Sequence, residues 1–106
     1  MRPHENLEAW NKAVDFVTKV YRATESFPRE EKFGLTSQIR RAAVSIPANI
    51  AEGAARDSKK EFVYFLSNAQ GSASELETEL LIAKNWVFWP IGVTQHCDPN
   101  STVLVE

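Results

Sequence analysis

The fold is decided by residues 58–84, which read SKKEFVYFLSNAQGSASELETELLIAK. Ser58 followed three residues later by Glu61 is a capping box, a pattern typical of the start of a helix. From Phe62 onward, apolar residues recur at alternating steps of four and three, which places them on one helical face. The stretch therefore predicts a helix of about 39 Å that begins after Ser58 and ends near Lys84.

Towards the N-terminus, a second apolar stripe predicts another helix. It begins near Asn6, a residue type favoured at the N-cap, and it ends before Pro28, because the residue preceding a proline is disfavoured in the helical region. Its apolar positions are separated by steps of three and four: Leu7, Trp10, Val14, Val17 and Tyr21.

Between these two helices, the sequence predicts a third that runs from about Thr36 to Gly53. Its core stripe consists of Leu35, Ile39, Ala42, Ala43, Ile46 and Ile50. Gly53 is expected to form the C-cap, where glycine is common. Pro47 lies within the pattern, and we expect it to bend the helix there, because proline lacks a backbone donor.

Three long helices joined by short links predict an all-α, up-and-down fold of the four-helix-bundle type, with residues 1–85 as the helical domain. The helical pattern is lost over residues 86–106. Pro90, Gly92 and Pro99 interrupt this stretch, and many of its residues are β-branched. We therefore expect an atypical non-helical tail, with the fourth helix missing or replaced. Its aromatic residues either fold back over the exposed groove or leave that groove to another subunit.

Length and cysteine content restrict the class of protein. The chain has 106 residues, which fits one domain, and its single cysteine, Cys97, has no internal disulfide partner. The polar N-terminus shows no signal-peptide pattern, and no stretch approaches the roughly 20 apolar residues of a membrane-spanning helix. The expected location is the cytoplasm.

Two of the predicted helices carry apolar residues outside their core stripes. Val44 and Ala48 lie opposite the core stripe of the helix expected over residues 36–53. Val63 and Phe65 belong to a run in the helix expected after Ser58 that is apolar on every side. A helix that is apolar all round is expected to be buried all round. In so small a domain, another copy of the chain must supply that burial, so these four residues are the candidate oligomer interface.

Charge is unevenly distributed along the chain, although the net charge is only -2. Residues 35–60 carry five basic and two acidic side chains, whereas residues 61–106 carry one and six. The candidate nucleic-acid-binding residues are the five basic ones: Arg40, Arg41, Arg56, Lys59 and Lys60. Basic side chains supply most contacts to phosphates, but such a set is also common on a solvated surface.

No pattern in the chain favours catalysis, a metal or a cofactor. Glu75 and Glu79 are one helical turn apart, but bundle metal sites pair glutamate with histidine, so a solvated acidic face is the expectation. His96, Cys97 and Asp98 have the chemistry of a catalytic triad, but neighbours in sequence do not thereby form one. Nucleotide-binding glycine motifs and zinc-protease motifs are absent from the sequence.

Residues 5 to about 84 carry a resemblance to a known family. Residues 7–13 and 34–53, the latter reading GLTSQIRRAAVSIPANIAEG, together with residues 60–62 and 71–78, closely resemble the bacterial proteins encoded within intervening sequences of 23S ribosomal RNA genes. The resemblance implies a four-helix bundle and a ring-like pentamer. It also implies kinship with accessory proteins of diversity-generating retroelements, which bind reverse transcriptase and nucleic acid. The family pattern ends after Lys84, where a fourth helix is normally found.

These observations lead to two functional hypotheses. The first is a non-catalytic, self-assembling adaptor that binds RNA, DNA or a nucleoprotein partner by charge and shape. The second is an oligomeric scaffold that binds only protein. The two differ in salt dependence, because affinity for nucleic acid falls steeply as salt rises.

Overall fold

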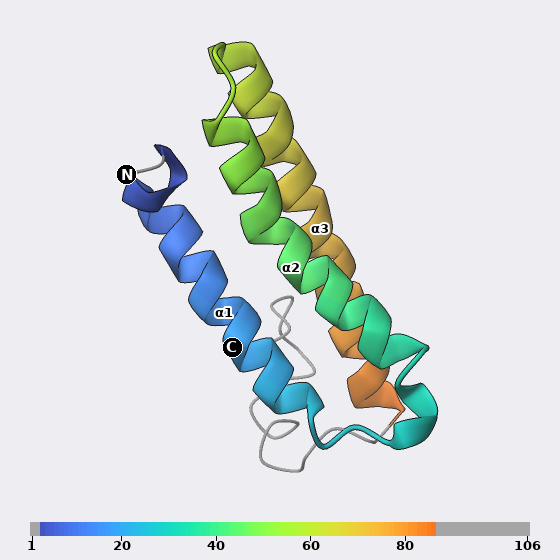
Figure 1. Cartoon of the computed structure of the whole chain (residues 1–106). Coiled ribbons are helices and arrows are strands. Elements are labelled where there is room, and N and C mark those ends of the chain that lie inside the picture. The colour runs from blue at the N-terminus through green and yellow to red at the C-terminus, as the bar shows by residue number, and fades with distance from the viewer. Residues whose placement is uncertain (1–2, 87–106) are drawn as a thin grey trace.

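The computed structural model describes residues 3–86, and these contain three long helices (Figure 1). They are α1 (Glu8–Thr24), α2 (Leu35–Ala54) and α3 (Lys59–Asn85). Two short 3₁₀ helices precede α1 and α2, namely η1 (Pro3–Asn6) and η2 (Arg29–Glu31). The described part of the chain has no strand, which confirms the all-α class and the three expected helices. The expected non-helical tail lies outside the described residues from position 87 onward.

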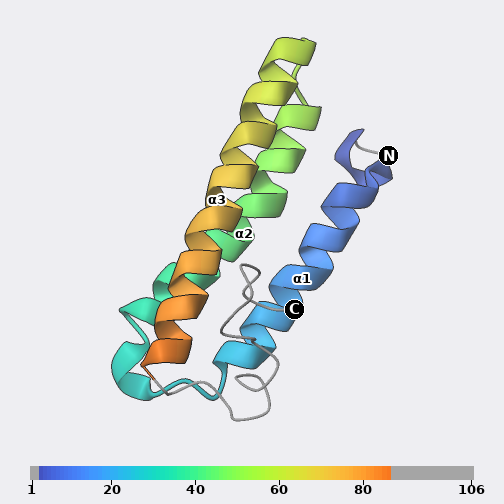
Figure 2. The same cartoon turned by 180° about the vertical axis from the view of Figure 1, so that it is seen from behind.

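The three helices run alternately up and down, with short turns between them, and α2 packs against both of the others (Figures 1 and 2). The α2–α3 pair is the closest and longest contact, whereas α1 stands farther from α3. This is the arrangement of three members of an up-and-down bundle. A complete four-helix bundle is not confirmed, since residues 3–86 supply three long helices.

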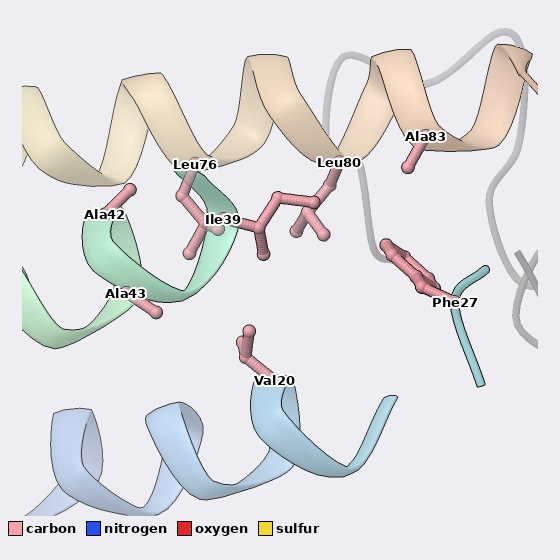
Figure 3. Packing of buried hydrophobic residues seen from close by; sticks show 8 residues of the cluster. All are labelled: Val20, Phe27, Ile39, Ala42, Ala43, Leu76, Leu80 and Ala83. Carbon is pink, nitrogen blue, oxygen red and sulfur yellow. The ribbon is translucent and has the colours of Figure 1, made fainter. Parts of the chain in front are cut away.

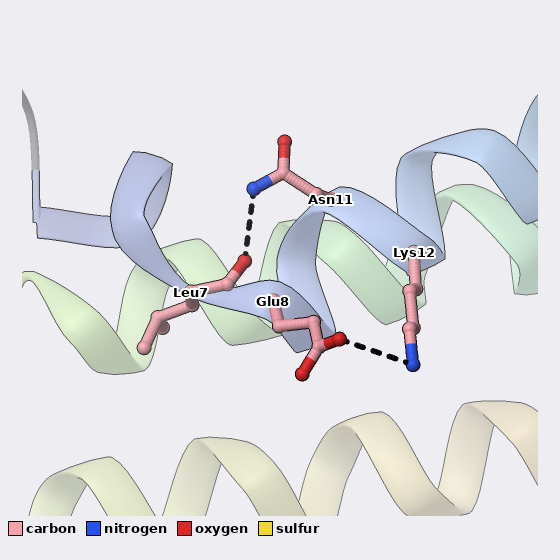
Figure 4. Close-up of polar contacts among 4 residues, drawn as sticks. All are labelled: Leu7, Glu8, Asn11 and Lys12. Atoms are coloured by element: carbon pink, nitrogen blue, oxygen red, sulfur yellow. Dashed lines mark hydrogen bonds and ion pairs between the residues drawn. The ribbon is translucent and has the colours of Figure 1, made fainter.

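The start of α1 differs from the sequence-based expectation. Asn6 belongs to η1, and the N-cap is Leu7, which has no side-chain cap hydrogen bond. Asn11 contacts this end through its side-chain amide, which donates to the Leu7 carbonyl at 3.0 Å (Figure 4). Lys12 pairs with Glu8 one turn before it at 3.3 Å. The helix ends at Thr24, ahead of Pro28, as expected.

Within α2, Pro47 and Gly53 both lie inside the helix and are buried. The helix continues past Pro47 without a break in its assignment. The prediction that Gly53 forms the C-cap is wrong, because the helix runs on to Ala54 and the cap is Ala55 in a right-handed helical conformation. Gly53 is instead required for close packing, since a Cβ atom there would lie 2.9 Å from the Cβ of Phe65.

The predicted N-cap at the start of α3, Ser58, is confirmed. The Ser58 hydroxyl accepts a hydrogen bond from the backbone N–H of Glu61 at 3.1 Å. The Glu61 carboxylate in turn accepts from the Ser58 hydroxyl at 3.3 Å. The cap satisfies one of the N–H groups that every helix start leaves without an intrahelical partner.

The core is built mainly from small and branched side chains of the predicted stripes (Figure 3). Ile39 is fully buried at its centre, and Val20 of α1 and Leu80 of α3 point towards it. A second cluster near the other end of the helices joins Ala13, Ile50 and Ala69. Alanines at the α2–α3 contact allow the backbones of these two helices to approach closely, which explains why this pair packs most tightly.

Candidate interaction surfaces

Arg40 stabilises the fold, although the sequence placed it among the candidate nucleic-acid-binding residues. Its Nε donates to the Thr24 hydroxyl at 2.8 Å, and its Nη2 donates to the Tyr21 carbonyl at 3.1 Å. The guanidinium carbon lies 4.4 Å from the centre of the Tyr21 ring, which is within range of a cation–π interaction. These contacts use the side chain to join α2 to the last turn of α1, so it is not presented to a phosphate.

Arg56 is also partly engaged within the chain. Its guanidinium forms an ion pair with Glu52, one turn earlier, and lies over the Phe65 ring at 4.9 Å from the ring centre. Both charged side chains remain substantially exposed, so the pair is weak and competes with solvent. Phosphate binding by Arg56 would require exchange of this partner.

The remaining three basic residues, Arg41, Lys59 and Lys60, are exposed, and none has an ion pair among residues 3–86. Lys59 and Lys60 occupy the first turn of α3, where a positive charge opposes the helix dipole and costs stability. The positions of Lys59 and Lys60 therefore do not contribute to the stability of α3. An anion bound at this end would meet both lysines and the helix N-terminus.

The five basic residues do not form one continuous patch. Arg40 and Arg41 are separated from the α2–α3 turn by about 20 Å of helix at 1.5 Å per residue. At the turn itself, residues 52–61 carry three basic and three acidic side chains, so their charges sum to zero. The basic surface predicted from sequence is thus divided into two small groups.

The outer face of α2 presents the first part of the candidate oligomer interface. Val44 is 42% exposed, Ala48 is exposed, and both lie opposite the buried stripe of α2. Beside Ala48, a shallow pocket of about 270 Å³ is formed by η1 and α2 and lined by Pro3, His4, Ala48, Ala51, Glu52 and Ala55. Sequence reasoning missed this pocket, because nothing in the helical pattern placed residues 3–6 against α2.

The two candidate interface residues on α3 behave differently from each other. Val63 is 51% exposed and its neighbour Tyr64 is 61% exposed, so both are available to a partner. Phe65 is half-buried and contacts Gly53 of α2, while the Tyr64 ring meets it edge-on at 5.1 Å between ring centres. Phe65 therefore packs within the chain, and Val63 with Tyr64 forms the outward apolar surface.

A polar pocket of about 310 Å³ lies where α2 meets α3. It is lined by Gln38, Arg41, Ala42, Ser45, Ser72 and Glu75. The hydroxyls of Ser45 and Ser72 are 2.7 Å apart and hydrogen-bond across the helix pair. Ser72 is therefore a position of close contact between α2 and α3, whereas Gly71 beside it faces open space.

The expectation that Glu75 and Glu79 form a solvated acidic face is wrong for Glu79. Its exposed fraction is 5%, and its Oε1 atom has no hydrogen-bond partner among the described residues. Burial, together with a hydrogen bond to Glu75 and repulsion from its charge, raises the pKa of Glu79 to about 7. The apolar stripe predicted from sequence passes directly beside this position, which explains the burial.

Three further features were considered from the sequence, namely a metal site, a catalytic group at residues 96–98 and a membrane-spanning helix. Within positions 3–86, no group of three or more His, Cys, Asp or Glu side chains is arranged to hold a metal ion. His96, Cys97 and Asp98 lie outside the described residues. None of the helices in positions 3–86 has the length and apolar character needed to span a bilayer.

The geometry defines this chain as a small all-α bundle protein with large apolar side chains exposed on each of its three long helices. The model of the 23S rRNA-intervening sequence protein family matches residues 5–97, so the chain belongs to that family. The match extends beyond Lys84, where the sequence pattern alone had suggested that the resemblance ends. No curated protein matches the chain.

Proposed function

We propose that this protein is a self-assembling helical bundle that works by binding rather than by catalysis. The observation that carries the proposal is the exposure of large apolar side chains on α2 and α3, which the folded monomer leaves only partly buried. They are Val44, Val63, Tyr64, Leu81 and Ile82, each between 42% and 61% exposed. Exposed apolar side chains that are neighbours, as Val63 and Tyr64 are and as Leu81 and Ile82 are, are typical of protein–protein contacts.

The stoichiometry that the family resemblance implies is a pentamer. Two separate apolar surfaces on one protomer, one on α2 and one on α3, are compatible with such a ring, in which each interface joins unlike surfaces. A symmetric dimer would need only one of them. The number of protomers in the oligomer therefore shows whether one or both of these apolar surfaces form interfaces.

The test is the mass of the full chain measured by light scattering after size exclusion. The unmodified protein is expected to form an oligomer at micromolar concentration, and Val44→Asp and Val63→Asp are each expected to lower its mass. Val14→Asp is the matched control, because Val14 is similarly exposed at 37% but lies on α1. A monomeric unmodified protein would refute the proposal, and a dimer would refute the pentamer alone.

A second candidate function is favoured by Lys59 and Lys60. Both are exposed, unpaired among residues 3–86, and placed where they oppose the helix dipole, which suits an external anion. With Arg41, they provide three available positive charges per protomer, and assembly would multiply them. Binding of RNA or of a nucleoprotein partner would follow from this repeated charge, whereas a scaffold that binds only protein would not need it.

A further inference from the structure

Glu79 occupies a position on α3 that is unusual for an acidic residue. Leu76, Leu80 and Ala83 flank it on the same face, with exposed fractions of 2%, 5% and 0%. Glu79 itself is 5% exposed, and its Oε1 atom lacks a hydrogen-bond partner within positions 3–86. A charged carboxylate in such a place loses its hydration without gaining a replacement, so its neutral form is favoured.

The charged groups around Glu79 do not compensate for this loss. On α3, Glu75 lies one turn earlier and carries a charge of the same sign, which adds repulsion. On α2, Gln38 and Arg41 line a pocket together with Glu75, but neither glutamate has an ion pair with Arg41. The contribution of α1 to the same core is apolar Val20.

We propose that the packing of α3 against α2 is linked to protonation of Glu79, so that the helix pair is held together with this carboxyl neutral and is weakened when it ionises. The groups that respond to pH are two carboxyl groups, those of Glu79 and Glu75, rather than a histidine. The carboxyl of Glu79 is buried, and a hydrogen bond to the Glu75 carboxyl favours the protonated form of Glu79. The proposal is independent of assembly and of nucleic-acid binding.

The sign of the effect follows from the direction of the pKa change. The pKa of Glu79 is raised from 4.5 to about 7 in the folded chain, so the folded state binds the proton more tightly than the unfolded state does. Its stabilising contribution is complete below about pH 4.5 and is lost as pH rises through about 7. From low pH to well above pH 7, the resulting increase in the unfolding equilibrium constant approaches about 300-fold.

The test is urea unfolding of the full chain between pH 4.5 and 8.5, at a protein concentration held constant. Glu79→Gln keeps the shape of the neutral acid without its ionisation, so we expect it to abolish most of the rise in the unfolding constant. Glu77→Gln is the matched control, because Glu77 is exposed on the same helix. It should follow the pH profile of the unmodified chain. Equal profiles for the Glu79→Gln variant and the unmodified chain would overturn the proposal.

A direct titration keeps the proposal testable if the variant folds poorly. The side-chain carboxyl carbon of Glu79, observed by NMR in the unmodified ¹³C-labelled protein, should titrate near pH 7. Glu75→Gln should move that midpoint to lower pH, because it removes the repelling charge beside Glu79. Titration of Glu79 below pH 5 in the unmodified chain would overturn the proposal whatever the variants do.

Discussion

Gly53 and Gly71 both lie inside helices, yet the space beside them differs completely. A Cβ atom at Gly53 would meet the Cβ of Phe65 at 2.9 Å and the backbone oxygen of Phe62 at 3.2 Å, whereas one at Gly71 would meet nothing within 4 Å. A backbone atom does not move aside as the end of a flexible side chain does. The close approach of α2 to α3 therefore depends on Gly53 and not on Gly71.

Substitution by alanine at these two glycines is expected to have opposite effects on stability. Alanine gains about 1 kcal/mol over glycine in a helix interior. At Gly53, overpacking costs up to about 3 kcal/mol and outweighs that gain, so Gly53→Ala should lower the free energy of unfolding by up to about 2 kcal/mol. Gly71→Ala should raise it by about 0.5–1 kcal/mol. Urea denaturation of both variants tests this, and equal stability of the two would contradict the packing argument.

At the scale of the helices, Arg40 and Arg41 are neighbours in sequence with different roles. Arg40 joins α2 to α1 through two hydrogen bonds and the Tyr21 ring, while Arg41 is exposed and has no hydrogen bond or ion pair among the described residues. Arg40→Ala should therefore destabilise the chain by about 1–2 kcal/mol. Hydrogen exchange should show that protection is lost first in α1.

Arg41→Ala is the internal control for that prediction. Because Arg41 packs against little, its removal should change the free energy of unfolding by less than about 0.5 kcal/mol. If the two substitutions destabilise α1 equally, the contacts of Arg40 do not hold that helix.

The sequence predicted the helices well because the determinants of a helix are local. The steps of the apolar stripes and the Ser58 cap depend on residues within one or two turns of each other. The structure confirms the cap and most of the stripes of α2 and α3. In α1 the predicted stripe is partly wrong, because Val14 and Tyr21 are exposed whereas Ala13 and Val20 are buried. What the sequence did not predict depends on partners far along the chain. Arg40 contacts a residue 16 positions earlier, and Gly53 is required by the aromatic side chains of α3. Glu79 is buried beside Leu76 and Leu80, which belong to the core cluster shared with α2. From residue type and sequence spacing alone, Arg40 was interpreted as a surface charge, Gly53 as a helix C-cap and Glu79 as a solvated acid.

At the scale of the whole molecule, charge limits what one protomer does alone. The chain has a net charge of -2, and three of the five candidate basic residues, Arg41, Lys59 and Lys60, remain available. Three phosphate contacts give a weak interaction, and about 20 Å of helix separates Arg41 from the α2–α3 turn that precedes the lysines. Useful affinity for RNA therefore requires several protomers that present their charges together.

The final prediction couples RNA binding to assembly. If each protomer makes three phosphate contacts with single-stranded RNA, the affinity of one protomer should fall about 20-fold between 50 and 200 mM salt. The affinity of an oligomer, which makes more contacts, should fall more steeply. Reversal of both lysines, Lys59→Glu with Lys60→Glu, should weaken binding in fluorescence anisotropy and leave the oligomer's mass unchanged. Val44→Asp should weaken binding through the loss of assembly, although it removes no positive charge. If affinity is unaffected by the lysine reversal and by salt, RNA is not bound through this surface, and the protein-only scaffold is the function that stands.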